Sequence, residues 1–209
     1  MPSQPPSPLL RTRRRQEREE TRRQILLAAD AFLRERSYRE LSVDELMRRT
    51  GHTRTVFYRH FGGLPELVME VLQSVGAELM EVSRDWAVAF AAPPERAREN
   101  LARIVDFFAR HGTLLRAVAD AASYDDDIER LYRQVIEGFV MMTAEALERR
   151  IVAGEMPDLD APETARALTW MNERYLLDAF GRGEPSDPKR VLDALWTVWS
   201  SVAYARDAR

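Results

Sequence analysis

Apolar residues recur along most of the chain at spacings of three and four residues, which is the period of an α-helix with one buried face. The first such run predicts a helix from about Glu17 to Arg36. No stretch shows a convincing alternation of apolar and polar residues, which is the pattern of a strand. The sequence therefore predicts an all-α protein.

Turn and capping residues divide this pattern into about nine predicted helices. Ser42 and Glu45 have the spacing of a capping box, in which each side chain binds an unpaired backbone amide at the start of a helix. Gly51 suits the left-handed position that ends a helix, and Thr53 begins the next one. Pro65 opens a long helix. The later helices are expected at 94–110, 112–122, 126–153, 161–181 and 188–205.

The chain divides into three predicted segments. Residues 1–15 are Pro-rich and then basic, and we expect them to form a disordered basic arm. Residues 16–65 are expected to form a three-helix domain, in which short helices at 42–49 and 53–60 flank a tight turn. This spacing is typical of a helix-turn-helix, whose second helix enters the major groove of DNA. Residues 66–209 are expected to form a larger helical-bundle domain.

The charge is distributed unevenly between these segments. Residues 1–65 carry 14 Arg and 8 acidic residues, whereas the rest of the chain carries 17 basic and 26 acidic residues, so that the net charge is −3. A basic segment on an acidic body indicates either contact with a polyanion or a solvated arginine-rich tail. The charge alone leaves both interpretations open.

Several classes of protein are excluded by what the sequence lacks. There is no cysteine, so disulfides, thiolate metal sites and cysteine nucleophiles are excluded. The three histidines have no metal-ligand spacing, and no P-loop, dinucleotide fingerprint or nucleophile elbow occurs. We therefore expect no cofactor, no metal and no enzymatic activity. The longest apolar run, from Trp86 to Ala92, is too short to span a membrane, and no signal peptide is evident, so a cytoplasmic, nucleoid-associated bacterial protein is expected.

The second short helix carries side chains that suit contact with DNA. Thr53, Arg54 and Thr55 lie at its N-terminus, where the backbone amides favour phosphate. Hydroxyl and imidazole groups can donate to phosphate oxygens, and arginine can also reach base edges. The alternatives are half-buried packing for Tyr58 and a plain surface position for His60. The expected DNA-binding residues are Ser42, Thr53, Arg54, Thr55, Tyr58, Arg59 and His60.

The segments from Leu41 to Leu46 and from Gly51 to Phe61 resemble the tetracycline-repressor (TetR) family over about residues 20–72. The family pattern is Gly-x-Ser/Thr, four residues, then Tyr-x-His/Tyr-Phe. The resemblance implies that the second helix of the unit reads DNA. It also implies that ligand binding in the other domain moves the two DNA-binding domains of a dimer apart.

Two positions depart from the family pattern. Leu64 replaces a usual Lys, and Gly63 replaces a usual Ser, which removes one expected phosphate contact. The basic arm, through Arg13, Arg14 and Arg15, either compensates on the DNA backbone or in the minor groove, or is a solubilising tail.

The C-terminal part, from Met171 to Arg174 and again around Arg190 to Asp193, is similar to the actinobacterial repressors that control activation of the drug ethionamide. Those repressors have a long, mostly aromatic ligand tunnel, lined by an asparagine and a tryptophan at the places of Asn172 and Trp199. The resemblance implies that a tunnel here is lined also by Phe107, His111, Tyr132, Ile136, Phe139, Met142, Thr143, Glu173 and Leu177.

The residues themselves give a less specific picture of the same region. Large aromatic side chains, among them Trp86, and several methionines fit either an irregular apolar cavity or an ordinary core. Asn172 shares an apolar helix face, so its amide either satisfies a backbone group or orients a ligand. Glu173 on the adjacent stripe either faces a ligand or pairs with Arg174 or Arg166.

The last predicted helix is apolar on two stripes, so both of its sides are expected to be buried. One side would face the core, and the other, with the helix at 161–181, would form a four-helix homodimer interface. Two-fold symmetry predicts a palindromic operator in double-stranded DNA. The expected function is a transcriptional repressor released by a small apolar effector. The alternatives are an activator or an effector-independent DNA-binding protein, and an enzyme is the weakest hypothesis.

Overall fold

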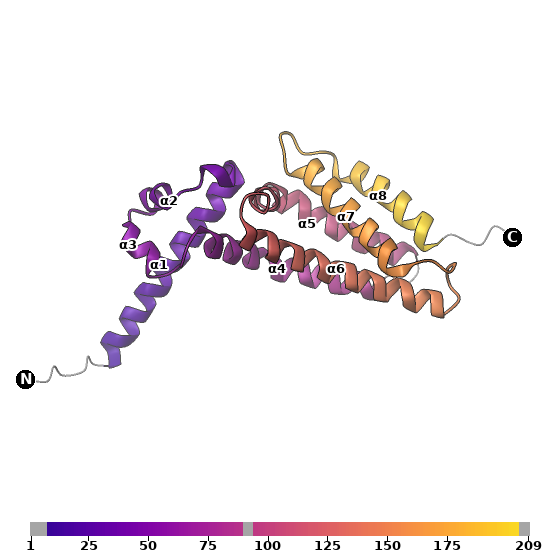
Figure 1. Cartoon of the computed structure of the whole chain (residues 1–209), viewed down its shortest axis with the longest axis horizontal. Coiled ribbons are helices and arrows are strands. Elements are labelled where there is room, and N and C mark those ends of the chain that lie inside the picture. Colours follow the sequence, from indigo (N-terminus) through magenta and orange to yellow (C-terminus); the bar gives the residue numbers. More distant parts are fainter. Residues whose placement is uncertain (1–7, 90–93, 205–209) are drawn as a thin grey trace, which may run out of the picture. The chain divides into compact units, whose positions relative to one another are not determined.

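The computed structural model describes residues 8–89 and 94–204, and side chains within 12–82 and 94–204 (Figure 1). All regular structure in these ranges is helical, which confirms the predicted all-α class. The elements are α1 (Pro8–Glu35), the short 3-10 helix η1 (Tyr38–Glu40), α2 (Val43–Thr50), α3 (Arg54–Tyr58), α4 (Leu64–Ala89), α5 (Pro94–Ala121), α6 (Asp126–Val152), α7 (Ala161–Phe180) and α8 (Pro188–Ala203). None of the described helices is long and apolar enough to cross a membrane.

The chain forms two compact units that meet between Val71 and Leu72, within α4. We expected the boundary earlier, at residue 65. The first turns of α4 belong to the N-terminal unit because Leu67 and Val68 are completely buried and Glu70 forms an ion pair with Arg22 of α1. Pro65 therefore lies in the first turn of a helix that completes the core of this unit.

In the N-terminal unit, α1 packs on α2, and α2 packs on α3. The largest fully buried side chains include Phe32 and Ile25 from α1, Leu46 from α2 and Phe57 from α3. Gly51 ends α2 with a φ of 71°, the left-handed conformation predicted from the sequence. The tight turn between the two short helices thus depends on a residue without a Cβ atom.

Helix α1 begins at Pro8, so residues 8–15 of the expected disordered arm are helical, and residues 1–7 of that arm lie outside the described residues. Ion pairs one helical turn apart join Arg13 to Glu17 and Arg15 to Glu19, at 3.0 and 2.8 Å. Such pairs stabilise a helix even where no apolar stripe exists, and this is why the apolar pattern did not reveal this part of α1.

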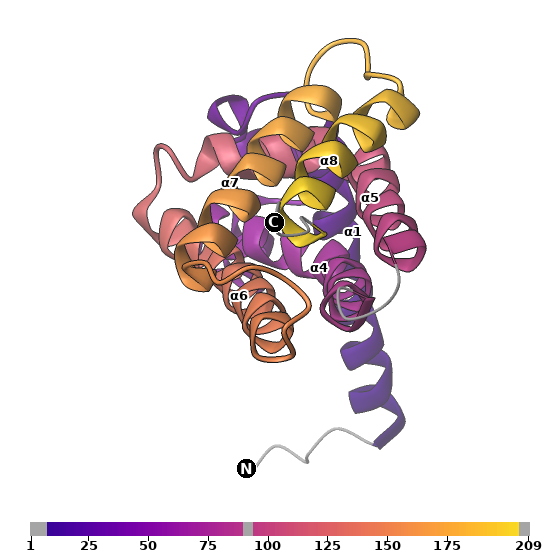
Figure 2. The ribbon, with the colours of Figure 1, turned by 90° about the vertical axis from the view of Figure 1, so that its right-hand side faces the viewer.

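In the C-terminal unit, α7 contacts α5, α6 and α8, and α5 contacts the other three of these helices. Figure 2 shows α5, α6, α7 and α8 nearly end-on as a bundle. The core of the bundle includes Leu101, Leu147, Ala165, Leu176 and Trp199, each exposed by 1% or less. Asp187 caps α8 by accepting a hydrogen bond from the Lys189 amide, and Pro188 occupies its first turn, as the sequence predicts.

Helix α5 is continuous through Gly112, where the sequence predicted a break between helices at 94–110 and 112–122. A Cβ atom at Gly112 would lie 2.6 Å from the carbonyl oxygen of Phe180, at the end of α7. Gly181 directly follows Phe180, and a Cβ atom at Gly181 would lie 2.7 Å from the Cβ atom of Arg116. Gly112 therefore lets two backbones approach closely and does not end a helix.

Candidate nucleic-acid interface and effector cavity

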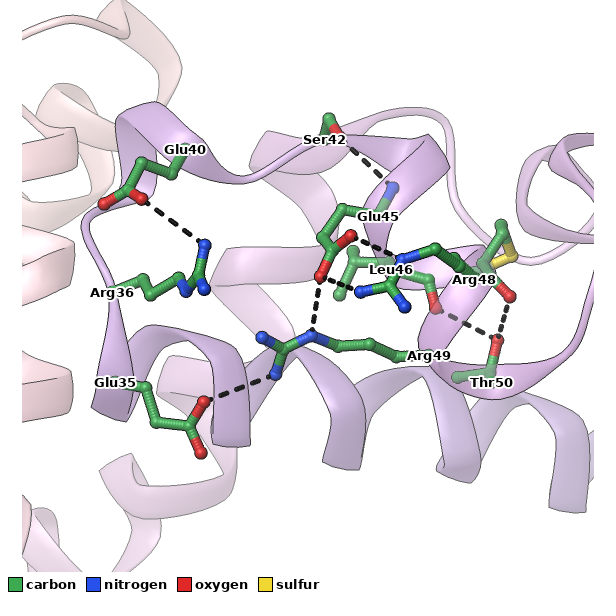
Figure 3. Close-up of polar contacts among 10 residues, drawn as sticks. Glu35, Arg36, Glu40, Ser42, Glu45, Leu46, Arg48, Arg49 and Thr50 are labelled. Carbon is green, nitrogen blue, oxygen red and sulfur yellow. Dashed lines mark hydrogen bonds and ion pairs between the residues drawn. The ribbon is translucent and has the colours of Figure 1, made fainter.

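The helix-turn-helix is held by a cluster of ion pairs on α2. The Ser42 hydroxyl accepts a hydrogen bond from the Glu45 amide at 3.2 Å, as the predicted capping box requires. The Glu45 carboxylate does not reach back, however, because Arg48 and Arg49 donate to it at 2.8–3.0 Å (Figure 3). Hydrogen bonds from Arg48 and then Arg49 lower the pKa of Glu45 to about 2. A complete capping box occurs instead at η1, between Ser37 and Glu40.

Arg49 also ties α2 to α1. Its guanidinium lies 3.5 Å from the Glu35 carboxylate (Figure 3). It also lies 4.8 Å from the centre of the Phe32 ring. At the end of α2 the Thr50 hydroxyl donates to the backbone carbonyl of Leu46 at 3.2 Å. The helix that precedes the turn is therefore fixed at several points, so that it supports the orientation of α3.

Helix α3 presents one face to the core and the other to solvent. Phe57 is completely buried, and its ring lies 5.5 Å from that of Phe61. Thr53, Arg54, Thr55, Tyr58 and Arg59 are exposed, and Tyr58 keeps 54% of its surface accessible. The predicted DNA-binding residues of α3 thus lie on one outward surface. Thr53 is the N-cap, but its side chain makes no capping hydrogen bond.

Arg54 makes its contacts on this outward surface. It donates to Asp44 of α2 at 2.8 Å, with both side chains more than half exposed. Hydrogen bonding to Tyr58, followed by the charge of Asp44, raises the pKa of Arg54 above its usual value. An exposed ion pair of this kind contributes little stability, so phosphate can replace Asp44 as a partner at small cost.

His60 lies at the edge of α3 in a different environment. Its Nδ1 atom is buried and has no hydrogen-bond partner among the described residues. Burial, and then the charges of Arg18 and Arg22, lower the pKa of His60. Arg18 of α1 also donates to the Arg59 carbonyl at 3.2 Å. The other predicted basic residues, Arg13, Arg14 and Arg15, are exposed on α1.

The C-terminal unit encloses a cavity of about 110 Å³, lined by helices α4 to α8. The predicted residues that line it are Tyr132, Ile136, Phe139, Met142, Thr143, Asn172, Glu173, Leu177 and Trp199. Sequence reasoning did not identify the lining residues Leu72, Leu79, Ile104, Phe108, Leu115, Val135, Thr169 and Leu176. Helical spacing could have found some of them, because Thr169 lies three and four residues before Asn172 and Glu173.

Two predicted residues do not line this cavity. Phe107 is buried and packs its ring 4.8 Å from the ring of His111. His111 in turn lies 3.2 Å from the Glu78 carboxylate of α4. Each therefore makes its contacts elsewhere in the unit, outside the lining of this cavity. The side chain of Trp86 lies outside the described residues.

Two polar pairs stand at the cavity wall. The amide oxygen of Asn172 accepts a hydrogen bond from the Trp199 indole Nε1 at 2.9 Å. The Tyr132 hydroxyl donates to the Glu173 carboxylate. Burial and then the Glu173 charge raise the pKa of Tyr132, so the phenol remains a donor. Arg166 pairs with Glu137, so the pairing of Arg166 with Glu173 that the sequence suggested is wrong.

Comparison with known families assigns both units. Residues 25–71 match the model of the bacterial regulatory proteins of the tetR family, and residues 97–205 match the model of the C-terminal domain of the transcriptional regulator EthR. The second match covers more than half of the chain. Both models describe transcriptional regulators and not enzymes.

Individual proteins give the same result. The HTH-type transcriptional regulator EthR of Mycobacterium tuberculosis (strain CDC 1551 / Oshkosh) is 29% identical over 192 residues, which cover 88% of this chain and 87% of that protein. The EthR of Mycolicibacterium smegmatis is 25% identical over 184 residues, covering 86% and 84%. These similarities extend through both units.

Solved structures share the fold. A TetR-family regulator from Syntrophomonas wolfei superposes with a TM-score of 0.73 at 14% identity, covering 91% of this chain and 99% of that one. Another from Rhodococcus sp. has a TM-score of 0.69 at 18% identity, with coverage of 88% and 99%. Taken with the exposed α3 and the EthR-type C-terminal domain, these matches show that the chain belongs to the TetR family of DNA-binding transcriptional regulators.

Proposed function

We propose that this regulator is a homodimeric repressor that releases a palindromic operator when a small, largely apolar molecule fills the cavity of the C-terminal unit. The observation that carries the proposal is the outward face of α3, where Thr53, Arg54, Thr55, Tyr58 and Arg59 are exposed together above a buried Phe57. Donors on one exposed helix face suit phosphate and base edges.

The apolar surface of α7 and α8 supports the homodimer. Tyr175 and Val198 each keep 39% of their surface exposed, although neighbouring residues of the same helices are buried. Val191, Leu195, Trp199 and Ala203 form the buried stripe of α8, and Val198, three residues after Leu195, lies at the exposed edge of that stripe. A second copy of α7 and α8 would cover these side chains and bring two α3 helices to a two-fold-symmetric operator.

The cavity supports an effector. Its lining is almost entirely apolar, with a few polar groups supplied by α6 and α7. This composition is typical of small-molecule sites, in which polar groups orient a ligand held by apolar contact. To release DNA the ligand must bind one conformation of the dimer more tightly than the other.

The proposal is tested with the full chain and a duplex selected from a random library by its affinity for the protein. We expect the selected duplexes to contain inverted repeats and light scattering to give the mass of a dimer. A lone subunit that ignores such duplexes in dilute salt would overturn the proposal. The Arg54→Ala variant should lose affinity, while Arg133→Ala on α6 serves as an exposed control.

The effector part has its own test. The Asn172→Trp variant fills the cavity, so it should either block ligand binding or mimic the ligand and lower operator affinity. Unchanged affinity for both ligand and operator would place the effector site elsewhere. The release step fails if a saturating ligand leaves operator affinity unchanged.

A further inference from the structure

The cavity of the C-terminal unit carries one charged side chain. Glu173 of α7 lines it and is only 8% exposed. Among the described residues that line the cavity, none is Lys, Arg or His. The remaining polar lining groups are those of Thr143, Thr169, Tyr132 and Asn172 and the indole N–H of Trp199. The electrostatic character of the cavity is therefore set by one negative group.

The hydrogen bonding of Glu173 is incomplete. The Tyr132 hydroxyl donates to Oε1, and no other described residue donates a hydrogen bond to the carboxylate. A carboxylate has about four acceptor positions, so most of its capacity is unused. A buried charge is costly unless it is paired and hydrogen-bonded, so this carboxylate lacks a counterpart.

The charges of Arg174 and Arg116 act on Tyr132, but neither arginine makes a direct contact with Glu173. Arg166 pairs with Glu137, and Arg116 pairs with Asp120 at 2.9 Å. Arg174 follows Glu173 on α7, but its side chain is exposed and does not line the cavity. No described Lys, Arg or His donates a hydrogen bond to the Glu173 carboxylate, so a cation bound in the cavity would be its first direct charged partner.

We propose that the effector is a cationic amphiphile, an apolar amine whose ammonium group binds Glu173 and whose hydrocarbon body lies against the apolar lining. This inference rests on the proposed function of the cavity as the effector site. A neutral ligand would leave the carboxylate without a cation, and an anionic ligand would be repelled. A cavity of about 110 Å³ is smaller than the roughly 150 Å³ cavity that admits benzene, so an unbranched alkyl chain of about five carbons is a fitting size.

Isothermal titration calorimetry of the full chain with three matched probes tests this. The probes are pentylamine, pentanol and pentanoate, which share an alkyl chain and differ in charge. We expect the amine to bind at least about tenfold more tightly than the alcohol, and the acid to bind most weakly, because a desolvated charge pair distinguishes them. Glu173→Gln should reduce the amine to the affinity of the alcohol. Tyr132→Phe should keep the preference for the amine, since it removes only the hydrogen bond from Tyr132 to the Glu173 carboxylate.

The control is Asp178→Asn, which removes an exposed carboxylate of the same helix outside the cavity and should leave the preference intact. Equal binding of amine and alcohol, an amine preference that persists in Glu173→Gln, or failure of all three probes to bind would overturn the inference. Operator affinity is measured separately. If the amine binds through Glu173 yet leaves operator affinity unchanged, the charge preference stands and the effector function fails.

Discussion

The indole nitrogen of Trp199 on α8 donates a hydrogen bond to the side-chain oxygen of Asn172 on α7 at 2.9 Å. Trp199 is 1% exposed, so its N–H has no access to water. The bond joins the two helices whose outer surfaces form the proposed dimer interface, and it does so at the cavity wall.

We predict that this bond is measurable by a double-mutant cycle. Asn172→Leu removes the acceptor of this hydrogen bond and should lower the free energy of unfolding by about 0.5–1.5 kcal/mol. Trp199→Phe removes the donor as well as packing. The coupling energy between the two substitutions should be about 0.5–1.5 kcal/mol in urea unfolding. A coupling near zero would show that the bond does not contribute to stability.

Gly112 gives a second prediction. In Gly112→Ala the added methyl would meet backbone atoms of Phe180, which cannot move aside as a flexible side chain could. We expect a loss of about 1–3 kcal/mol in the free energy of unfolding, as overpacking commonly costs. Gly138→Ala on α6 is the matched control, because a Cβ there meets nothing within 4 Å. It should be neutral or stabilising, since alanine favours a helix. Equal effects of the two substitutions would contradict the close approach.

Tyr58 tests the phosphate-binding role of α3. We expect Tyr58→Phe to weaken binding to all duplexes about equally, by roughly 1–2 kcal/mol, because a phosphate contact carries no sequence information. Fluorescence anisotropy with the selected operator and with unrelated duplexes measures this. Tyr124→Phe, which changes an exposed tyrosine of the C-terminal unit, should have no effect. A loss confined to the operator would assign Tyr58 to base recognition instead.

His60 should make DNA binding dependent on pH. In the free protein, burial and Arg18 lower the pKa of His60, so the imidazole is neutral at neutral pH. A nearby phosphate favours the charged form, so DNA binding would take up a proton and affinity should rise as the pH falls from about 8 to 6. The slope should disappear in His60→Gln and persist in His111→Gln. An unchanged slope in His60→Gln would exclude this residue as its source.

The lowered pKa of His60 also makes the stability of the free protein depend on pH. Because the folded state disfavours the protonated imidazole, the unfolded state binds the proton more readily. The contribution of His60 to stability is therefore complete above the unfolded pKa of about 6.5 and is lost as the pH falls below it. Thermal unfolding without DNA should show a smaller loss on acidification in His60→Gln than in the unmodified chain.

Local signals predicted the N-terminal unit well. The predicted role of Ser42 as N-cap and that of Gly51 as C-cap each depend on the backbone conformation at one position. The structure confirms both roles. The role of Glu45 was predicted wrongly because its carboxylate can reach either the capping amide or the arginines of the next turn, and two arginines provide the stronger partners. Residues 8–15 were missed because their helix is supported by ion pairs, which leave no apolar period.

The C-terminal unit shows where sequence reasoning fails. Gly112 has the same local signature whether it ends a helix or admits a neighbouring backbone, and only the distant Phe180 distinguishes the two. In the same way, Phe107 and His111 occupy aromatic positions typical of a cavity wall, yet they contact one another. Such choices depend on packing between segments far apart in the chain. Asn172 and Trp199 were placed at the cavity through family resemblance, and the bond between them was not anticipated.

The close packing at Gly112 and Gly181 also limits which substitutions the chain can accept. Both positions are closed to any side chain, while Gly76 and Gly138 have open space for one. A saturation library sorted for folded protein should therefore recover only glycine at the first two positions and many residues at the other two. Variants made to alter ligand selectivity should therefore keep glycine at Gly112 and Gly181.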